Sequence, residues 1–393
     1  MGASLHPDAQ VQPEVKRVVI SGYYGFHNSG DEAVLKSMLF ALEEEGRQQG
    51  VRIVPVVLSI DPAWTTRMYG VEAVHRMRLT EVIRAIRSSD GLISGGGSLL
   101  QDATGALTIP YYTGVLKLAQ LLRKPTFIYA QGIGPVNRRW MDPLIRGVMR
   151  RSAYVSVRDA ESAALLGRIG VPAERIDVVP DPVMGMPLPA GAVQGDASRD
   201  SADSAVPVVG VSLRHWRKDE ADLARAVEAL GALARSRAVR LRFLPFHTPS
   251  DVETSQWVME RLGDLGPGSS AEMAAPGDDP QLMLQAVSEC DLLFGMRLHA
   301  LIYAANQSVP MIGLSYDPKI DQFLKRVGLE AIGTTEQLDA AAFVAEACRL
   351  IDRREEWLAE HKAAIGQLKT EAKRPAKQIA SLLRHNNRGD KRT

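Results

Sequence analysis

The sequence predicts an α/β fold made of two doubly wound, Rossmann-like domains that face a cleft, followed by C-terminal helices. Short, near-continuous apolar runs alternate with amphipathic helical windows along the 393 residues. This alternation is typical of parallel sheets covered by helices on both faces. Residues 186–207 interrupt it with a stretch rich in Ala, Ser, Asp, Gly and Pro. Such a composition favours a flexible linker between two domains.

The first half of the chain supplies six expected strands, each a short run of mostly apolar residues. They are residues 17–22, 53–60, 91–97, 126–134, 154–157 and 176–181. Helical patterns fill the gaps between them, at residues 31–46, 79–88, 109–123, 138–151 and 159–169. Strands that alternate with helices pair in parallel, because each crossover helix returns the chain to the same edge of the sheet.

The same alternation resumes after the interruption. The expected strands are residues 208–213, 239–246, 291–294 and 311–314. The expected helices are residues 219–235, 250–263, 279–288, 297–307 and 318–327, with two more at about 336–353 and 355–384. The predicted division is an N-terminal domain (15–185), a flexible linker (186–207), a C-terminal domain (208–350), and a last segment (351–393) whose helix packs back on the N-terminal domain and ends in a basic tail.

Composition excludes several classes of protein. The net charge is only +1, which gives no reason to expect nucleic-acid binding. The two cysteines, Cys290 and Cys348, lie far apart in apolar contexts and are interpreted as thiols in a reducing compartment. No apolar stretch approaches the length of a membrane-spanning helix, and the first residues lack the apolar core of a secretory signal. We therefore expect a soluble, cytosolic protein.

Three glycine-rich turns follow strands of the N-terminal domain. They are "SGYYGFHNSGDEAVL" (21–35), "ISGGGSLLQDATG" (93–105) and "AQGIGPVNRRW" (130–140). None matches the P-loop or the dinucleotide-binding pattern of glycines. Glycine lets a backbone approach a ligand closely, and helices that begin after such turns offer unpaired N–H groups to anions.

Cationic side chains follow the strands of the C-terminal domain. They are Arg214, His215, Arg217, Lys218, His247, Arg297, His299 and Lys319. Because the carboxyl ends of parallel strands meet at one edge of a sheet, His299 and Lys319 are expected to be near neighbours there. Paired carboxylates, HExxH and clustered Cys/His spacing are missing around them, so the sequence predicts a small anionic ligand, no metal and no other cofactor.

Six motifs together resemble the polysaccharide pyruvyltransferase family, and most closely its bacterial cell-wall branch, which modifies the polymer that anchors S-layer proteins. They are "GYYGFHNSGDEAVL", "ISGGGSLLQD", "YAQGIGP", "VSVRDAESAALL", "DVVPDPV" and "FGMRLHALIYAANQSVPMIGLSYDPK". The resemblance runs from about residue 17 to 330, and "GMRLHA" followed by "YDPK" is its most specific part.

This resemblance implies a glycosyltransferase-B-like fold and a ketal-forming transferase that uses phosphoenolpyruvate. The acceptor that it implies is a lipid-linked cell-wall saccharide, such as one ending in N-acetylmannosamine, which receives a 4,6-O-ketal. The catalytic residues that it implies are His299, Lys319 and Arg139. Phosphoenolpyruvate carries a phosphate and a carboxylate on three carbons, which agrees with a site dense in cations.

The residues then divide between the two substrates. The donor contacts are expected to be Arg297, Arg214, His215, Gly295 and Leu298, all in the C-terminal domain. The acceptor contacts are expected to be Asp31, Asn28, Gly96, Gly97, Ser98 and Asp102, all in the N-terminal domain. His299 is assigned to proton transfer or phosphate stabilisation, because imidazole titrates near neutral pH. Asp31 or Asp102 is the candidate base on the sugar hydroxyl.

Two other functions remain open on the sequence. One is a nucleotide-sugar-dependent glycosyltransferase of the same architecture. Many such enzymes carry a Glu on the helix before a "GVP" turn; the equivalent position here is Tyr303, and residues 297–307 contain no carboxylate. The other is a saccharide-binding protein without activity, which would not need so many cations at one sheet edge.

A lipid-linked acceptor would also require contact with a membrane. The arginines within residues 138–151 and the tail "RHNNRGDKRT" are the candidate contacts with the inner leaflet. The protein is therefore expected to associate with the membrane reversibly, without spanning it.

Overall fold

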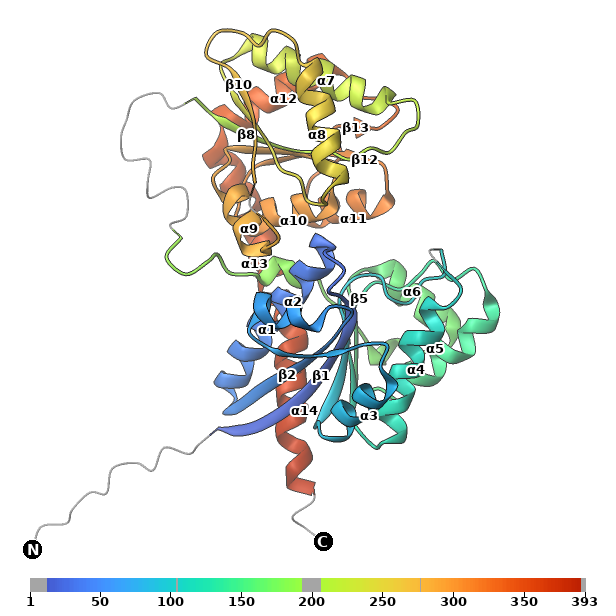
Figure 1. The fold of residues 1–393 in the computed structure, drawn as a ribbon. Helices are drawn as coiled ribbons and strands as arrows, with labels where there is room; N and C mark the ends of the chain where they lie inside the picture. Colours follow the sequence, from blue (N-terminus) through green and yellow to red (C-terminus); the bar gives the residue numbers. More distant parts are fainter. Residues whose placement is uncertain (1–12, 104, 193–205, 276, 390–393) are drawn as a thin grey trace, which may run out of the picture. The chain divides into compact units, whose positions relative to one another are not determined.

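The computed structural model describes residues 13–103, 105–192, 206–275 and 277–389. Two parallel sheets with helices around them confirm the predicted doubly wound α/β fold (Figure 1). Contacts along the chain divide it into two compact units. The second unit consists of Gly25–Ser37 and Val179–Ala372; the first unit holds the remaining described residues. Part of the predicted linker, residues 193–205, lies outside the described residues, as do residues 390–393 of the predicted basic tail.

The first unit contains a seven-stranded parallel sheet in the order β3-β2-β1-β4-β5-β6-β7. Its strands are β1 (Glu14–Tyr24), β2 (Val51–Ser59), β3 (Glu72–His75), β4 (Gly91–Gly95), β5 (Thr126–Gln131), β6 (Tyr154–Val157) and β7 (Ile176–Val178). The strand order reverses between β1 and β4. Ligands of open parallel sheets bind beyond the carboxyl ends of the strands at such a reversal.

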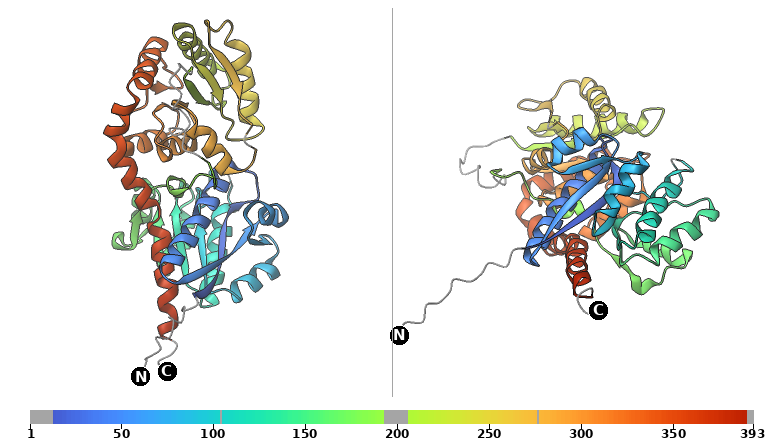
Figure 2. Two further views of the ribbon diagram at one scale, coloured as in Figure 1. Left: turned by 90° about the vertical axis from the view of Figure 1, so that its left-hand side faces the viewer. Right: turned by 60° about the horizontal axis from the view of Figure 1, so that its bottom comes forward.

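Helices cover both faces of this sheet. They are α1 (Ser29–Gln48), α2 (Pro62–Tyr69), α3 (Leu79–Arg87), α4 (Thr108–Leu121), η1 (Arg139–Met141), α5 (Asp142–Met149), α6 (Ala160–Ile169), η2 (Ala173–Arg175) and α14 (Arg374–Gly389). Helices α3 to α6 share one apolar cluster with a face of the sheet. Helix α14 lies along β2, β5 and β6 (Figure 2, left).

The second unit contains a six-stranded parallel sheet in the order β10-β9-β8-β11-β12-β13. Its strands are β8 (Val208–Ser212), β9 (Arg240–Phe243), β10 (Ser270–Met273), β11 (Leu292–Gly295), β12 (Met311–Ser315) and β13 (Gly333–Thr334). The strand order reverses between β8 and β11. The loops that follow these two strands therefore lie where ligands of open parallel sheets bind, as do the loops after β1 and β4 in the first sheet.

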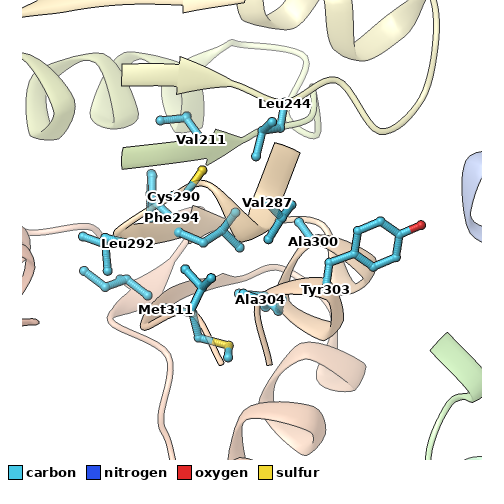
Figure 3. Close-up of a cluster of buried hydrophobic side chains, with 14 of the residues drawn as sticks. Val211, Leu244, Val287, Cys290, Leu292, Phe294, Ala300, Tyr303, Ala304 and Met311 are labelled. Carbon is cyan, nitrogen blue, oxygen red and sulfur yellow. The ribbon is translucent and has the colours of Figure 1, made fainter. Parts of the chain in front are cut away.

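The helices of the second unit lie on the two faces of its sheet (Figure 1). They are η3 (Pro182–Gly185), α7 (Ala221–Ser236), α8 (Ser250–Arg261), α9 (Pro280–Ser288), α10 (Leu298–Asn306), α11 (Pro318–Val327), α12 (Ala340–Asp352) and α13 (Arg354–Ala372). Figure 3 shows part of the core, where Phe294 of β11 and Tyr303 of α10 lie among aliphatic side chains. Tyr303 is buried against Phe246, with 5.2 Å between the ring centroids.

The structure differs from the sequence prediction at three edge strands, at α2, which was not predicted, and at the last predicted helix. Strands β3, β10 and β13 were not predicted, because "EAVH", "SAEM" and "GT" contain no continuous apolar run. The single helix expected at 355–384 is two helices, α13 and α14. Pro375 explains the break, because proline has no N–H and its ring clashes with the preceding turn.

The division into units also differs from the predicted domain boundaries. Gly25–Ser37, expected in the N-terminal domain, groups with the second unit. Its Ala33 and Val34 are part of the apolar core of that unit, and Lys36 forms an ion pair with Asp279 at 3.0 Å. Helix α13 also belongs to the second unit, where its Trp357, Ile365 and Leu368 are buried in the same core.

Candidate functional site

The carboxyl ends of β8, β11 and β12 position most of the predicted donor residues. These strands are neighbours in the sheet. Arg214 and His215 follow β8, Arg297 and His299 follow β11, and Lys319 follows β12 in the first turn of α11. The structure therefore brings these five residues to one edge of the second sheet, at the reversal of strand order.

His299 lies in the first turn of α10, beside a buried carboxylate. Its Nε2 is 3.9 Å from Oδ2 of Asp181, and the Asp181 side chain is only 7% exposed. Asp181 is also the N-cap of η3, where its Oδ1 accepts a hydrogen bond from the Val183 N–H at 3.1 Å. The carboxylate is thus fixed by the backbone and lies within ion-pair distance of the imidazole.

The glycine-rich turn of residues 25–31 lies against the same histidine. A Cβ atom built on Gly30 would be 2.7 Å from Cε1 and 2.9 Å from Nδ1 of His299. Asn28 closes the turn, because its Oδ1 accepts a hydrogen bond from the Gly30 N–H at 3.1 Å. The first turns of α1 and α10 therefore meet at His299. Each helix N-terminus carries a partial positive charge, so this junction favours an anion.

Arg297 is bound to a carboxylate of its own unit. Its guanidinium donates to both carboxylate oxygens of Asp251, which is buried in α8. Oδ2 of Asp251 also accepts a hydrogen bond from the His247 N–H at 3.0 Å. Because its charge is compensated, Arg297 is better placed to hold the start of α10 against α8 than to supply charge to a donor anion.

Arg214 and Lys319 differ from Arg297 in how their positive charge is paired. Throughout residues 13–389, apart from the undescribed gaps, neither of them forms an ion pair with a carboxylate. Arg214 instead lies over the rings of Trp216 and Tyr316, at 5.2 and 5.1 Å from the ring centroids, and donates to the Tyr316 hydroxyl at 2.9 Å. Lys319 is the second residue of α11, and its backbone N–H donates to the side chain of the N-cap, Asp317, at 2.9 Å. These two residues are the strongest candidates for binding an anion.

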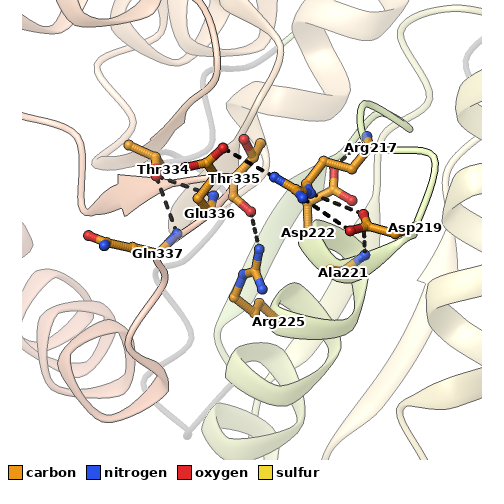
Figure 4. Close-up of polar contacts among 9 residues, drawn as sticks. All are labelled: Arg217, Asp219, Ala221, Asp222, Arg225, Thr334, Thr335, Glu336 and Gln337. Atoms are coloured by element: carbon orange, nitrogen blue, oxygen red, sulfur yellow. Dashed lines mark hydrogen bonds and ion pairs between the residues drawn. The ribbon is translucent and has the colours of Figure 1, made fainter.

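The remaining cations after β8 have a different environment. His215 and Lys218 are exposed. Arg217 pairs with Asp219 at 3.0 Å and with Glu336 at 3.2 Å (Figure 4). This network joins the loop after β8 to the turn at 334–337, and so stabilises the loop that carries Arg214.

The first unit has its own polar group at the carboxyl ends of β4, β5 and β6. Gly96 and Gly97 have φ angles of 82° and 58°, which favour glycine, and they lead to Ser98. Ser98 Oγ accepts a hydrogen bond from Arg158, the residue that follows β6, at 2.9 Å. A Cβ atom on Gly132 would lie 2.8 Å from Ser98 Oγ and 2.9 Å from Nε of Arg158, so a larger residue would push these two side chains away.

The hydrogen bonds of Asp102 differ from those expected of a catalytic base. Its carboxylate accepts hydrogen bonds from the Asn137 N–H at 2.9 and 3.0 Å and from the Arg138 N–H at 2.8 Å. These bonds, that of Asn137 first, lower its pKa. A carboxylate in this environment holds the turn after Pro135 in place and is a poor proton acceptor.

We expect Asp102→Asn to lower the melting temperature at neutral pH and to do so less in acid. The pKa of Asp102 is depressed in the folded protein, so its stabilisation is present above the ordinary pKa of aspartate and is lost as pH falls through the folded-state pKa. Thermal melts of both proteins at about pH 7 and about pH 3 measure this. An equal difference at both pH values would contradict the assignment.

The predicted site residues divide between the two units. Arg139 is exposed in η1 of the first unit, beside Arg138. Asn28 and Asp31 belong with His299 in the second unit, although they were expected on the acceptor side with Gly96 to Asp102. In the parts of the chain that are described, no group of three or more His, Cys, Asp or Glu side chains could hold a metal ion.

Three residues of these sites were not singled out from the sequence. Asp181, Gly30 and Arg158 each lie within a quoted motif, but no role was assigned to them. Arg158 directly follows a strand, so the rule that ligands bind at carboxyl ends could have found it. Asp181 and Gly30 approach His299 from segments far away in the sequence, and periodicity carries no signal for such contacts.

Comparisons with known proteins agree with this architecture. Residues 28–318, well over half of the chain, match the model of the family described as Polysaccharide pyruvyl transferase. None of the curated proteins matches the chain. Among solved structures, UDP-GlcNAc 2-epimerase from Methanocaldococcus jannaschii has a TM-score of 0.62 at 13% identity, covering 94% of this chain and 99% of that chain. HepE from Anabaena, in complex with UDP and glucose, has a TM-score of 0.59 at 14% identity, with the same coverage of 94% and 99%. These likenesses establish the glycosyltransferase-B-like fold alone.

Proposed function

Because the chain belongs to the polysaccharide pyruvyl transferase family, and is thus a transferase, we propose that it moves a pyruvyl group from phosphoenolpyruvate to a lipid-linked cell-wall saccharide. The product is a 4,6-O-ketal on a sugar such as N-acetylmannosamine, and phosphate is released. The observation that carries the proposal is the position of His299, where the first turns of α1 and α10 meet.

The charges of the second unit suit this donor. Phosphoenolpyruvate has two anionic groups, and Arg214 and Lys319 at this sheet edge form no ion pair with a carboxylate of the described residues. The N–H groups at the start of α10 add hydrogen-bond donors. Arginine can bind an anion through two parallel hydrogen bonds, whereas lysine acts as a point charge. Both cations thus belong to donor binding in this proposal.

The reaction then needs a proton at one carbon and two hydroxyl additions at its neighbour. His299 gives a proton to the methylene carbon of phosphoenolpyruvate, which becomes the methyl group of the product. The adjacent carbon becomes electrophilic and is attacked by the sugar 4-OH. Phosphate leaves and the 6-OH closes the ring; one of the two hydroxyl protons returns to His299 and the other leaves with phosphate. Asp181 holds the imidazole in position for the first step.

A nucleotide-sugar-dependent glycosyltransferase is the second candidate. The UDP in the complex of the Anabaena protein favours it, because that protein has the same fold. However, the position that would carry a ribose-binding Glu is Tyr303, which is buried against Phe246. Burial raises the pKa of Tyr303, so its hydroxyl stays neutral. This position can therefore not bind a ribose without opening the core.

A donor screen by thermal shift separates the two candidates. A ligand that binds the folded state raises the melting temperature in proportion to its saturation. We expect phosphoenolpyruvate to stabilise the protein, and UDP, UDP-glucose and UDP-N-acetylglucosamine to leave it unchanged. Stabilisation by the uridine nucleotides alone would favour the glycosyltransferase.

We predict that Gly30→Ala lowers turnover by about 10–100-fold, because the new methyl group must displace the imidazole of His299 and small misplacements of a reacting group are costly. Steady-state kinetics with saturating donor measure the effect. Gly114→Ala in α4 is the matched control, since a Cβ there meets nothing within 4 Å. Normal turnover in Gly30→Ala would remove this turn from the site.

A further inference from the structure

The guanidinium of Arg214 is held by a hydrogen bond on one side and has none on the other. Its Nη1 donates to the Tyr316 hydroxyl at 2.9 Å. Its Nε is buried and has no hydrogen-bond partner in the described parts of the chain, and Nη2 donates to none of the described residues either. A buried N–H without a partner costs free energy. The Nε–Nη2 side of Arg214 is therefore where a ligand is expected to bind.

The neighbouring Arg297 indicates what kind of ligand suits this side of a guanidinium. Arg297 uses the same two nitrogens, Nε and Nη2, to donate to both carboxylate oxygens of Asp251. Two parallel N–H groups match the two oxygens of a planar carboxylate. Arg214 follows β8 and Arg297 follows β11, which are paired strands of the same sheet. Arg214 thus offers a second carboxylate-binding pair of nitrogens at this sheet edge, with no carboxylate of the described residues bound to it.

Two aromatic side chains restrict the orientation of Arg214. Trp216 lies in the loop after β8 and Tyr316 directly follows β12, so they come from the two strands that flank β11. Their ring centroids are 4.7 Å apart, and the guanidinium carbon of Arg214 lies 5.2 Å from the first and 5.1 Å from the second. A cation is attracted to the face of an aromatic ring. The Tyr316 hydroxyl and the two rings together limit the rotation of the guanidinium.

We propose that Tyr316 and Trp216 are positioning residues, which hold Arg214 so that its Nε and Nη2 bind the carboxylate of the donor. The phosphate is then left to Lys319, whose ammonium is a point charge in the first turn of α11, where backbone N–H groups also favour a phosphate. This inference rests on the proposed function, because it takes phosphoenolpyruvate as the donor. It deepens that function by assigning each anionic group to one residue and by adding two residues that act through Arg214.

Isothermal titration of the full chain with three anions tests the assignment of the two groups. Phosphoenolpyruvate carries both groups, pyruvate only the carboxylate, and inorganic phosphate only the phosphate. We expect Arg214→Gln to weaken the binding of phosphoenolpyruvate and pyruvate by about 10–100-fold, the range for lost hydrogen bonds to a charged group, and to leave inorganic phosphate unchanged. Lys319→Ala should weaken inorganic phosphate and leave pyruvate unchanged. Arg214→Lys should recover little, because lysine keeps the charge but not the two parallel N–H groups.

A double-mutant cycle tests whether Tyr316 acts through Arg214. Tyr316→Phe removes only the hydroxyl and should weaken phosphoenolpyruvate and pyruvate about 3–10-fold, the range for one hydrogen bond. The same change in the Arg214→Gln protein should have no further effect, and Trp216→Leu should behave alike in both proteins. Trp257→Leu is the matched control. Arg261 lies 4.0 Å over the Trp257 ring at the C-terminal end of α8, away from these loops, so all three affinities should stay unchanged.

The outcomes separate this inference from the proposed function. Equal losses of pyruvate and inorganic phosphate binding in Arg214→Gln, or additive losses from Tyr316→Phe and Arg214→Gln, would overturn the inference. Failure of the unaltered protein to bind phosphoenolpyruvate would overturn the inference together with the proposed function. The expected affinities in a protein that forms no ketal product would support the assignment and contradict the proposed reaction alone.

Discussion

Replacing His299 with alanine is expected to lower turnover by about 10²–10⁴-fold, the usual contribution of a general acid. The proton for the methylene carbon would then have to come from water, and a high concentration of phosphoenolpyruvate should not restore the rate. The side chain is partly exposed beside Asp181, outside the apolar core, so the variant should keep its melting temperature. Phosphate release at saturating donor measures turnover.

The outcome that would contradict this role is specific. A His299→Ala enzyme with near-normal turnover and only a raised KM for the donor would mean that the imidazole merely binds phosphate. The proton donor would then have to be sought at His215, which is exposed, or at His247, whose N–H is bonded to Asp251. The pH dependence of turnover in single alanine variants of these two histidines would distinguish them.

Removing the charge of Lys319 is expected to weaken donor binding by about 10–100-fold, the range for a lost hydrogen bond to a charged group. Lys319→Ala should raise the KM for phosphoenolpyruvate more than it lowers turnover, because the ammonium binds the anion before and after the reaction alike. Lys319→Arg should recover part of the loss, since it keeps the charge but changes the geometry. Donor titrations at fixed acceptor measure both variants.

Lys325→Ala is the matched control for this prediction. Lys325 lies in the last turn of the same helix, α11, and is exposed. It should leave the KM unchanged. Equal effects of Lys319→Ala and Lys325→Ala would show that the charge of the helix, and not the position of Lys319, determines donor binding.

The sequence predicted the interior of both sheets well and their edges poorly. Central strands such as β4 and β11 are buried on both faces, so their residues form apolar runs that periodicity detects. Edge strands such as β10 are only partly buried and keep polar residues, so they resemble loops. The break before α14 was readable in principle from Pro375, but the helical pattern on both sides hid it.

The sequence predicted which sheet edge carries the candidate site, but not the contacts within the site. The parallel direction of the strands follows from the alternation of strands and helices, and it placed His299 and Lys319 at the same edge. Partners that arrive from distant segments could not be foreseen. Asp181 reaches His299 across 118 positions of the chain, and Asp251 compensates the charge of Arg297 from α8. The sequence also does not distinguish a carboxylate that accepts hydrogen bonds from backbone N–H groups, such as that of Asp102, from one that can accept a proton from a substrate.

Incubation with phosphoenolpyruvate and a lipid-linked saccharide that ends in N-acetylmannosamine tests the proposed reaction most directly. We predict that phosphate is released and that the saccharide gains the mass of one pyruvyl ketal in equal amount. His299→Ala should show neither product on the same time scale. Phosphate release without a mass gain, or transfer of a sugar from UDP-N-acetylglucosamine with no consumption of phosphoenolpyruvate, would contradict the proposed function.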